Sequence, residues 1–318
     1  MAATLPADLI ELGKPIRARR RDPAMHQLRA ALDTRLRDLL ARDPGTRVGT
    51  DPEELHQMRS AVRRMRAALK AAGPLLDRSW ADELRAELGW LGRSLGPVRD
   101  ADVLIERLRG RAAGFDQSSR DGAETLLDGL VVEREHARVE MLAALSSDRY
   151  LALLRTLAAA VSQPLPGARR GDTAATRRGS AARRELAELV HTEFSKVSKA
   201  ARRAGDDPPD EVLHALRIKV KRLRYTGELA LATGGKPMRR LVKSTVGLQD
   251  VLGEHQDACV AQDRVLRLLD ALGDVVDLDV VFAAGRLVER EEVSRLETRQ
   301  SWAAAWTKVQ SRAEALAA

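Results

Sequence analysis

Apolar residues recur along this chain at the spacing of α-helices. Leu55, Met58, Val62, Met65 and Leu69 fall on one face when successive residues are placed about 100° apart. Similar spacing runs through most of the sequence, and no period-2 run of β-branched residues bounded by turn pairs is present. The pattern therefore predicts an all-α fold.

Proline, glycine and capping residues divide this pattern into helices. Asp22-Pro23 and Asp51-Pro52 each place a capping residue before a proline at the first helical position. We expect Asp43-Pro44-Gly45 and Gly73-Pro74 to end the two helices that begin there. Ser79, with Asp82 three residues later, resembles a capping box that opens a third helix.

The remaining helices are expected on either side of a linker. A fourth helix is predicted over 121–161, with a candidate bend at Ser146-Ser147, and four more over about 183–204, 210–232, 237–272 and 277–316. Between the two sets, residues 162–184 contain prolines, glycines, six arginines and one acid, which is typical of a linker. The predicted organisation is a basic N-terminal extension (1–23), a first half (24–161), a linker (162–182) and a second half (183–318).

The two halves carry the same sequence blocks. The segment 55–66 returns as 213–224 at a spacing of 158, and 91–103 resembles 248–260 at a spacing of 157. A repeat this long indicates a duplicated domain and not a solenoid unit. We therefore expect two four-helix bundles related by an approximate two-fold axis.

Each copy of the first block also carries a row of cations beside its apolar face. The first cation stripe is His56, Arg59, Arg63, Arg66 and Lys70, and the second cation stripe is His214, Arg217, Lys221 and Arg224. No acid occurs from 55 to 76 or from 212 to 227. Like charges at i, i+4 each cost roughly 0.2–0.5 kcal/mol, a cost that an external anion would reverse. The stripes therefore predict binding of an extended anion, with Arg222, Arg35, Arg99, Arg134 and Arg138 as further candidates.

Two less specific interpretations stay open for the stripes. A basic helix face is often a solvated surface, and the cations could instead pair with acids of a neighbouring helix such as Asp100 or Asp257. The basic cluster at Arg17 to Arg21 and the arginines of the linker are equally ambiguous: they could attract a polyanion or simply be solvated.

Composition narrows the class of ligand. The 318 residues carry a formal net charge of +8, which favours acidic partners such as nucleic acid, anionic membranes or polyanionic metabolites. Aromatic residues make up only 3%, which disfavours a protein that stacks single-stranded bases.

The cellular location can be predicted from the cysteine content and from the lack of long apolar runs. Cys259 is the only cysteine, so no internal disulfide forms and a cage of several thiolates around a metal is excluded. No segment resembles a signal peptide or a membrane span. We therefore expect a cytoplasmic protein that does not bind membranes.

At these blocks the sequence resembles the CHAD family, the conserved histidine α-helical domains. The likeness covers about 24 to the C-terminus. It rests on the His-to-Arg blocks at 56–66 and 214–224, on the Leu-Gly-x-x-x-Asp blocks at 95–100 and 252–257, and on Leu248-Gln249-Asp250. Gln256 departs from the asparagine common in the family, and Glu193 stands where the first half has Arg35.

The resemblance implies two four-helix bundles with a basic channel that binds inorganic polyphosphate, and association with polyphosphate granules. Some members are fused to a CYTH triphosphatase domain, whose Glu-x-Glu-x-Lys signature is absent here. The chain would then be a stand-alone CHAD protein or a fragment of a longer one. We expect no catalysis and no cofactor.

Other interpretations of the same residues remain as alternatives. A metal site at His56 and His214 is disfavoured, because a cation would lie among arginines. Asp100 and Asp257 could serve acid catalysis or Mg²⁺ binding, but a salt bridge that orients a stripe arginine is the favoured interpretation. His136 and His255 are assigned no role. A polyphosphate or triphosphate hydrolase and a backbone-only nucleic-acid binder are the rival functions, although nucleic acid is not expected as the specific ligand.

Overall fold

The computed structural model describes residues 12–167, 180–273 and 276–317. Within these ranges it contains α-helices, one 3-10 helix and an isolated bridge between Leu76 and Gly167, but no strand. The helices are α2 (Ala24–Val48), α3 (Pro52–Ala71), η1 (Gly73–Leu75), α4 (Arg78–Ala112), α5 (Gln117–Leu145), α6 (Asp148–Ser162), α7 (Ser180–Ala204), α8 (Asp210–Leu229), α9 (Leu231–Ala271) and α10 (Leu278–Ala317). The all-α prediction is confirmed. Most of the predicted linker, including Arg169, Arg170, Arg177 and Arg178, lies outside the described residues, as does 1–11.

Several helix ends were predicted correctly from local sequence. Asp51 caps α3 by accepting a hydrogen bond of 2.8 Å from the backbone N–H of Glu53. The candidate bend at Ser146-Ser147 is a complete break between α5 and α6, where the Ser147 hydroxyl accepts from the backbone N–H of Tyr150. Gly235, at φ 63°, interrupts the helical geometry of α9 where a break was expected.

Other predicted ends are wrong because contacts with distant residues override local signals. Helix α2 continues through Pro44 and ends at Val48, before Gly49, whose φ of 75° is left-handed. The turn after Pro44 is held in place because Tyr150 Oη donates to Asp43 at 2.8 Å and Arg47 Nε donates to it at 2.7 Å. Likewise Asp77, not Ser79, caps α4 by accepting from the N–H of Trp80 at 3.1 Å.

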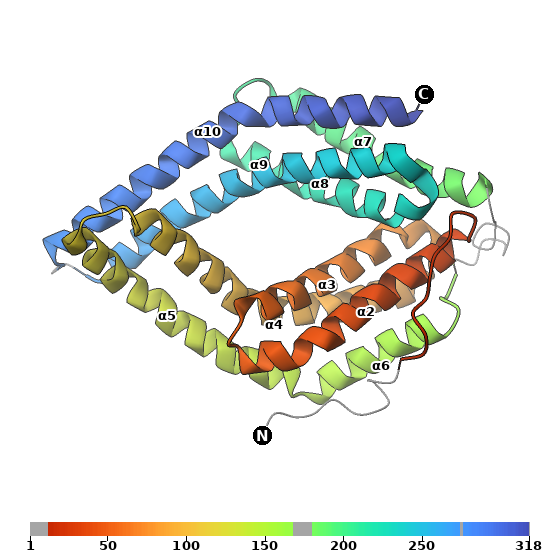
Figure 1. Cartoon of the computed structure of the whole chain (residues 1–318), viewed down its shortest axis with the longest axis horizontal. Helices are drawn as coiled ribbons and strands as arrows, with labels where there is room; N and C mark the ends of the chain where they lie inside the picture. The colour runs from red at the N-terminus through yellow and green to blue at the C-terminus, as the bar shows by residue number, and fades with distance from the viewer. Residues whose placement is uncertain (1–11, 168–179, 274–275, 318) are drawn as a thin grey trace.

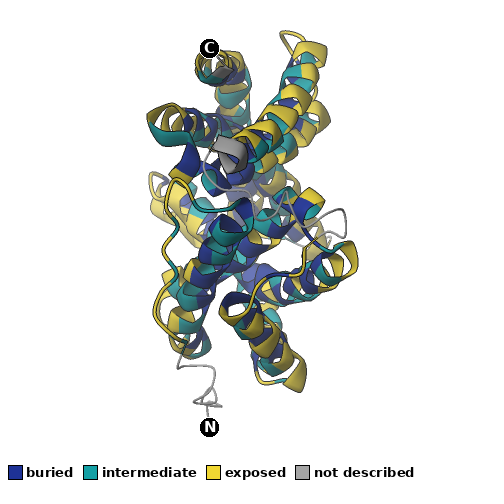
Figure 2. Ribbon diagram, turned by 90° about the vertical axis from the view of Figure 1, so that its right-hand side faces the viewer, coloured by how far each residue is buried: buried dark blue, intermediate teal, exposed yellow. Residues whose placement is uncertain are grey.

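The helices form two layers, with α2–α6 in the lower part of Figure 1 and α7–α10 in the upper part. Buried apolar residues cluster in two cores. The larger draws on α2 to α10, and the smaller joins the ends of α4 and α5 to those of α9 and α10. In Figure 2 the buried positions lie on the faces that the helices turn toward one another. Both cores therefore contain residues from each half of the chain.

The arrangement also brings the two predicted stripe helices together, since α3 contacts α8 directly. The internal duplication and the approximate two-fold axis stay predictions. Among the described residues, no helix has both the length and the apolar character needed to cross a membrane.

Candidate polyanion-binding site

Both cation stripes lie at the edge of a buried apolar face. In α3, Leu55, Met58, Val62 and Met65 are at most 4% exposed, while Arg63, Arg66 and Lys70 are exposed. In α8, Leu213, Leu216, Val220 and Leu223 are at most 2% exposed. Beside them His214 and Arg222 are exposed, and Arg217, Lys221 and Arg224 are half-buried. Helical periodicity thus gave the correct placement of these side chains.

The two stripes meet where α3 contacts α8. Burial, together with Arg217 of its own helix and with Arg63 and Arg59 of α3, lowers the pKa of Lys221 to about 8, although Asp257 opposes the shift. Burial also lowers the pKa of Lys70, with Arg222 of α8 as the next cause. Cations from the two halves are therefore close enough to repel one another.

Two cavities flank this contact, and their linings correspond at positions 158 apart. The first, of about 290 Å³, is lined by Arg35, Arg64 and Glu228 among others. The second, of about 260 Å³, is lined by the corresponding Glu193, Arg222 and Lys70, with Lys196 added. Each cavity therefore combines one acid with at least two cations, although the acid comes from a different helix in each.

Asp100 and Asp257 form ion pairs with the stripes. Arg59 Nη1 lies 2.5 Å from Asp100 Oδ1, and Arg217 Nη2 lies 3.8 Å from Asp257 Oδ1. A Cβ on Gly96 would lie 3.7 Å from Arg59 Nη2, an ordinary van der Waals distance, so the ion pair does not depend on a glycine there. The salt-bridge interpretation of these acids is confirmed, and two stripe cations are thereby partly neutralised.

Five other cations of α3 and α8 have no such partner. Within the described parts of the chain, no carboxylate lies within ion-pair distance of Arg63, Arg66, Lys70, Lys221 or Arg222. Arg224 is paired with Glu228 at 2.9 Å. The unpaired cations are the part of the surface that is available to an external anion.

The two stripe histidines have different neighbours. Burial lowers the pKa of His56, and the nearby guanidinium of Arg99 lowers it further. His214 Nδ1 instead contacts Gln256 Oε1, so the longer amide that departs from the family pattern does reach the histidine. The first histidine therefore lies in the more cationic environment.

Three of the additional candidates are engaged within the protein. Arg134 binds Asp102 at 2.5 Å and also contacts Glu135. Arg138 Nη2 donates to the backbone carbonyls of Arg47 and Val48 at the end of α2. Arg35 pairs with Asp38 at 2.7 Å while it lines the first cavity. The structure thus gives Arg134 and Arg138 local structural partners and does not place them in either stripe.

One cluster of potential ligands was missed from the sequence. Asp210, His255 and Cys259 each offer one ligand atom, and these atoms lie within 4.8 Å of one another. His255 was assigned no role. The i, i+4 spacing of His255 and Cys259 on one helix was a signal that could have revealed their proximity.

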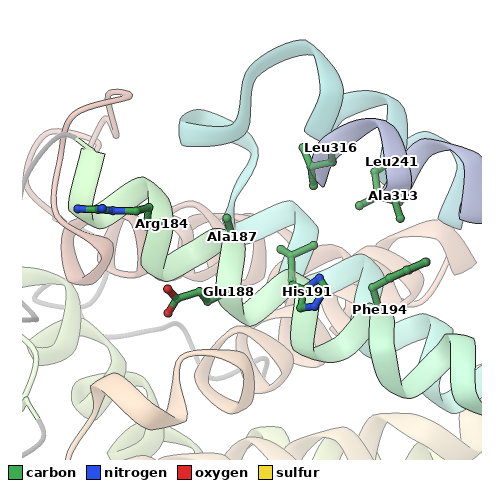
Figure 3. Close-up of a pocket in the computed structure, with 9 residues that line it drawn as sticks. Arg184, Ala187, Glu188, His191, Phe194, Leu241, Ala313 and Leu316 are labelled. Carbon is green, nitrogen blue, oxygen red and sulfur yellow. The ribbon is translucent and has the colours of Figure 1, made fainter. Parts of the chain in front are cut away.

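A further cavity has a different chemistry. A groove of about 270 Å³ between α7, α9 and α10 is lined mainly by apolar side chains, including Phe194, Leu241 and Leu316 (Figure 3). Arg184 lies at one end of it. With so few cations, this groove does not suit a polyanion.

Comparison with known proteins identifies relatives of this fold. The family model described as the CHAD domain matches residues 30–266. The chain is 30% identical over 297 residues to two Mycobacterium tuberculosis proteins, Uncharacterized protein MT2285 of strain CDC 1551 / Oshkosh and Uncharacterized protein Rv2226 of strain ATCC 25618 / H37Rv. Each match covers 90% of this chain and 54% of the relative, so the chain spans about half the length of the curated relatives it matches.

Two solved structures are also similar. The CHAD domain from the plant Ricinus communis has a TM-score of 0.70 at 27% identity, and the match covers 92% of this chain and 94% of that one. PptA from Streptomyces chartreusis has a TM-score of 0.69 at 21% identity, with 90% of this chain and 99% of that one covered. The second likeness concerns the fold alone.

Proposed function

The chain belongs to the CHAD domain family, and from this premise we propose that it binds inorganic polyphosphate along both cation stripes without hydrolysing it. The identity of the ligand is inferred from the family resemblance, and the surface along which it would bind is inferred from the position of the stripes. The protein would act as a polyphosphate-binding module, with a cytoplasmic location at polyphosphate granules.

The observation that carries this proposal is the environment of Lys221. It is half-buried and interacts with Arg217 on its own helix and with Arg63 and Arg59 from the other half. Bringing these cations together costs free energy, which Asp257 offsets only in part, and an external anion among them would offset more of it. A linear polymer with one negative charge per phosphate unit suits a continuous row better than a small, compact anion does.

The disposition of acids supports binding without catalysis. Metal-assisted phosphoryl transfer needs carboxylates around an ion. Asp100 and Asp257 are instead paired with Arg59 and Arg217. In the described part of the chain, the one cluster with three potential metal ligands includes no residue of either stripe.

A calorimetric titration with medium-length polyphosphate tests the proposal. Arg63→Glu combined with Arg222→Glu removes one unpaired cation from each of α3 and α8. Each lost charge-assisted contact is worth about 1.5–3 kcal/mol, so affinity should fall at least about 100-fold. The matched control is Arg267→Glu combined with Arg312→Glu, which reverses the charge of two exposed residues of α9 and α10 outside both stripes. It should change the affinity for polyphosphate by less than about threefold at physiological salt. Equal losses in both double variants would contradict the proposal.

Two further assays separate the rival functions. Incubation with Mg²⁺ or Mn²⁺ and long-chain polyphosphate should release no phosphate; release that Asp100→Asn abolishes would favour a hydrolase. In competition, duplex DNA should fail to displace polyphosphate at equal phosphate concentration. Salt dependence does not distinguish these ligands, because both release counterions on binding.

The greater length of the curated relatives suggests a partner domain for this chain. Since the curated relatives are about twice as long, this chain could function beside a further domain, and a CYTH domain is the partner that the family resemblance suggests. Co-purification of polyphosphate with the chain expressed alone would show that the binding module needs no such partner.

A further inference from the structure

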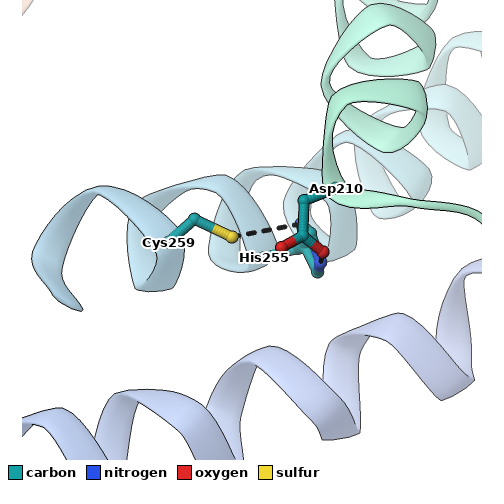
Figure 4. A group of neighbouring side chains, drawn as sticks. All are labelled: Asp210, His255 and Cys259. Atoms are coloured by element: carbon teal, nitrogen blue, oxygen red, sulfur yellow. Dashed lines mark hydrogen bonds and ion pairs between the residues drawn. The ribbon is translucent and has the colours of Figure 1, made fainter. Parts of the chain in front are cut away.

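A cluster of potential metal ligands lies where α8 begins beside α9. Asp210 is the first residue of α8, and His255 and Cys259 lie one turn apart on α9 (Figure 4). His255 Nε2 is 3.2 Å from Asp210 Oδ1, and His255 Nδ1 is 3.9 Å from Cys259 Sγ. The carboxylate thus approaches Nε2 of the imidazole and the sulfur approaches Nδ1, and one ligand atom from each of the three residues lies within 4.8 Å of the others.

We propose that Asp210, His255 and Cys259 bind one divalent transition-metal ion of the Zn²⁺ class. Oxygen, nitrogen and sulfur at bond lengths of about 2.0–2.3 Å form the usual ligand set of four-coordinate Zn²⁺. The ligand atoms lie within 4.8 Å of one another, which small side-chain adjustments can bring to tetrahedral spacing. Three protein ligands leave the fourth position for water or another donor.

The buried histidine supports a ligand at this position. His255 is only 2% exposed, and its Nε2 atom has no hydrogen bond of acceptable geometry although Asp210 is near. A buried imidazole nitrogen without a hydrogen bond is costly, and an ion shared with the carboxylate would satisfy it.

The surrounding arginines orient the carboxylate. Arg295 Nη1 lies 2.8 Å from Asp210 Oδ2, and Arg299 Nη1 lies 3.4 Å from Asp210 Oδ1. These two cations are themselves paired, Arg295 with Glu292 at 2.6 Å and Arg299 with Asp207 at 2.7 Å. With a neutral imidazole and thiol the group carries one net negative charge. A divalent ion with a thiolate brings it to neutrality, so the arginines do not exclude the ion.

A nucleophilic role for the cysteine does not fit this geometry. Burial raises the pKa of the Cys259 thiol to about 11, so in the absence of an ion the sulfur is protonated and unreactive. Direct coordination, in contrast, deprotonates a thiol. The cysteine is therefore assigned no nucleophilic role, and the metal proposal rests on the positions of the three side chains.

The corresponding positions of the first half could not form this site. Positions 158 and 157 earlier hold Pro52, Val98 and Asp102 in place of Asp210, His255 and Cys259. Only the aspartate is a metal ligand, and Arg134 already binds it at 2.5 Å. The proposal therefore requires one ion per chain.

Cobalt substitution tests the site directly. Chelator-treated protein, kept free of polyphosphate, is titrated with Co²⁺. We expect a thiolate-to-cobalt charge-transfer band in the near ultraviolet that saturates at one ion per chain. Cys259→Ser should abolish the band, and His255→Ala should weaken Co²⁺ binding at least about tenfold. His136→Ala, at an exposed histidine of α5, is the control and should leave the charge-transfer band and the Co²⁺ affinity unchanged.

The result that overturns the proposal does not depend on how the variants fold. Wild-type protein that shows no charge-transfer band at saturating Co²⁺ would refute it. So would a band that keeps its strength and affinity in a helical, folded His255→Ala variant, because cobalt would then bind the thiol alone. Polyphosphate affinity is measured separately, and neither result bears on the proposed function.

Discussion

The two helix junctions α3–α4 and α8–α9 are built on the same positions and differ in what surrounds them. In both, an arginine of the stripe reaches the aspartate that ends the Leu-Gly block, Arg59 to Asp100 and Arg217 to Asp257. Around this shared contact the first junction places Arg99 near His56, whereas the second places Gln256 against His214. The second alone adds His255 and Cys259.

The two halves thus share an ion pair and differ in the residues around it. The shared arginine and aspartate form the same ion pair in both halves. The variable positions change local charge and chemistry. The first junction is therefore the more cationic one, and the second is the one that can bind a metal ion.

The largest expected difference between halves concerns two ion pairs at corresponding positions. Glu291, which is fully buried, binds Arg107 at 2.5 Å and Arg111 at 3.0 Å, whereas Glu133 is 57% exposed and contacts Arg264. Removing one partner of a buried pair leaves an uncompensated charge. Glu291→Gln should therefore lower the free energy of unfolding by about 3 kcal/mol.

The matched variant Glu133→Gln should lower the free energy of unfolding by no more than about 1 kcal/mol, since the ion pair of Glu133 is exposed to solvent. Urea denaturation followed by circular dichroism measures both values. Equal losses would mean that burial does not distinguish the two pairs.

A smaller effect is expected from the pH dependence of binding. In the free protein Lys221, with a pKa of about 8, loses its proton as pH rises through 8, and bound polyphosphate should restore its pKa toward the ordinary 10.5. Affinity should therefore fall about tenfold more between pH 7 and pH 9 in wild type than in Lys221→Arg, whose guanidinium stays charged. Arg63→Lys, at the corresponding position of α3, serves as the comparison. Identical pH profiles for wild type and Lys221→Arg would remove Lys221 from the binding site.

The smallest effect concerns the two histidines. Because the Arg99 guanidinium lowers the pKa of His56, Arg99→Gln should raise that pKa toward the ordinary 6.5, as NMR titration would measure. The loss of a cation should also weaken polyphosphate binding a few-fold, and Gln256→Arg should strengthen it by a similar factor. In wild type, affinity should rise as pH falls below 6.5, since a phosphate favours the protonated imidazole. An unchanged His56 pKa in Arg99→Gln would show that burial alone determines it.

Periodicity and local signals predicted the parts of this molecule that depend on neighbours along the chain. The apolar and cationic faces of α3 and α8 follow from helical spacing, and Asp51 caps α3 as expected. Local signals failed at Pro44, because the contacts of Asp43 with Tyr150 and Arg47 stabilise another turn of α2.

The candidate site was only partly predictable for the same reason. The repeat indicated that two stripes exist, but their meeting at Lys221 depends on the packing of α3 against α8. Arg134 pairs with Asp102 of α4 and Arg138 donates to the end of α2, contacts that charge along the sequence does not reveal; their part in polyphosphate binding stays a prediction. The metal-ligand cluster likewise joins Asp210 on α8 to two residues of α9, a contact that sequence spacing does not encode.

The central claim is that the two stripes form one binding site and not two. Calorimetry with polyphosphate of a defined medium length tests this most directly, with wild type compared to Arg63→Glu and Lys221→Glu, single variants at corresponding positions of the two stripes. We predict one polyphosphate chain per protein, and a loss of affinity for that single site in either variant. Two chains per protein, with each variant abolishing only one of them, would contradict the account.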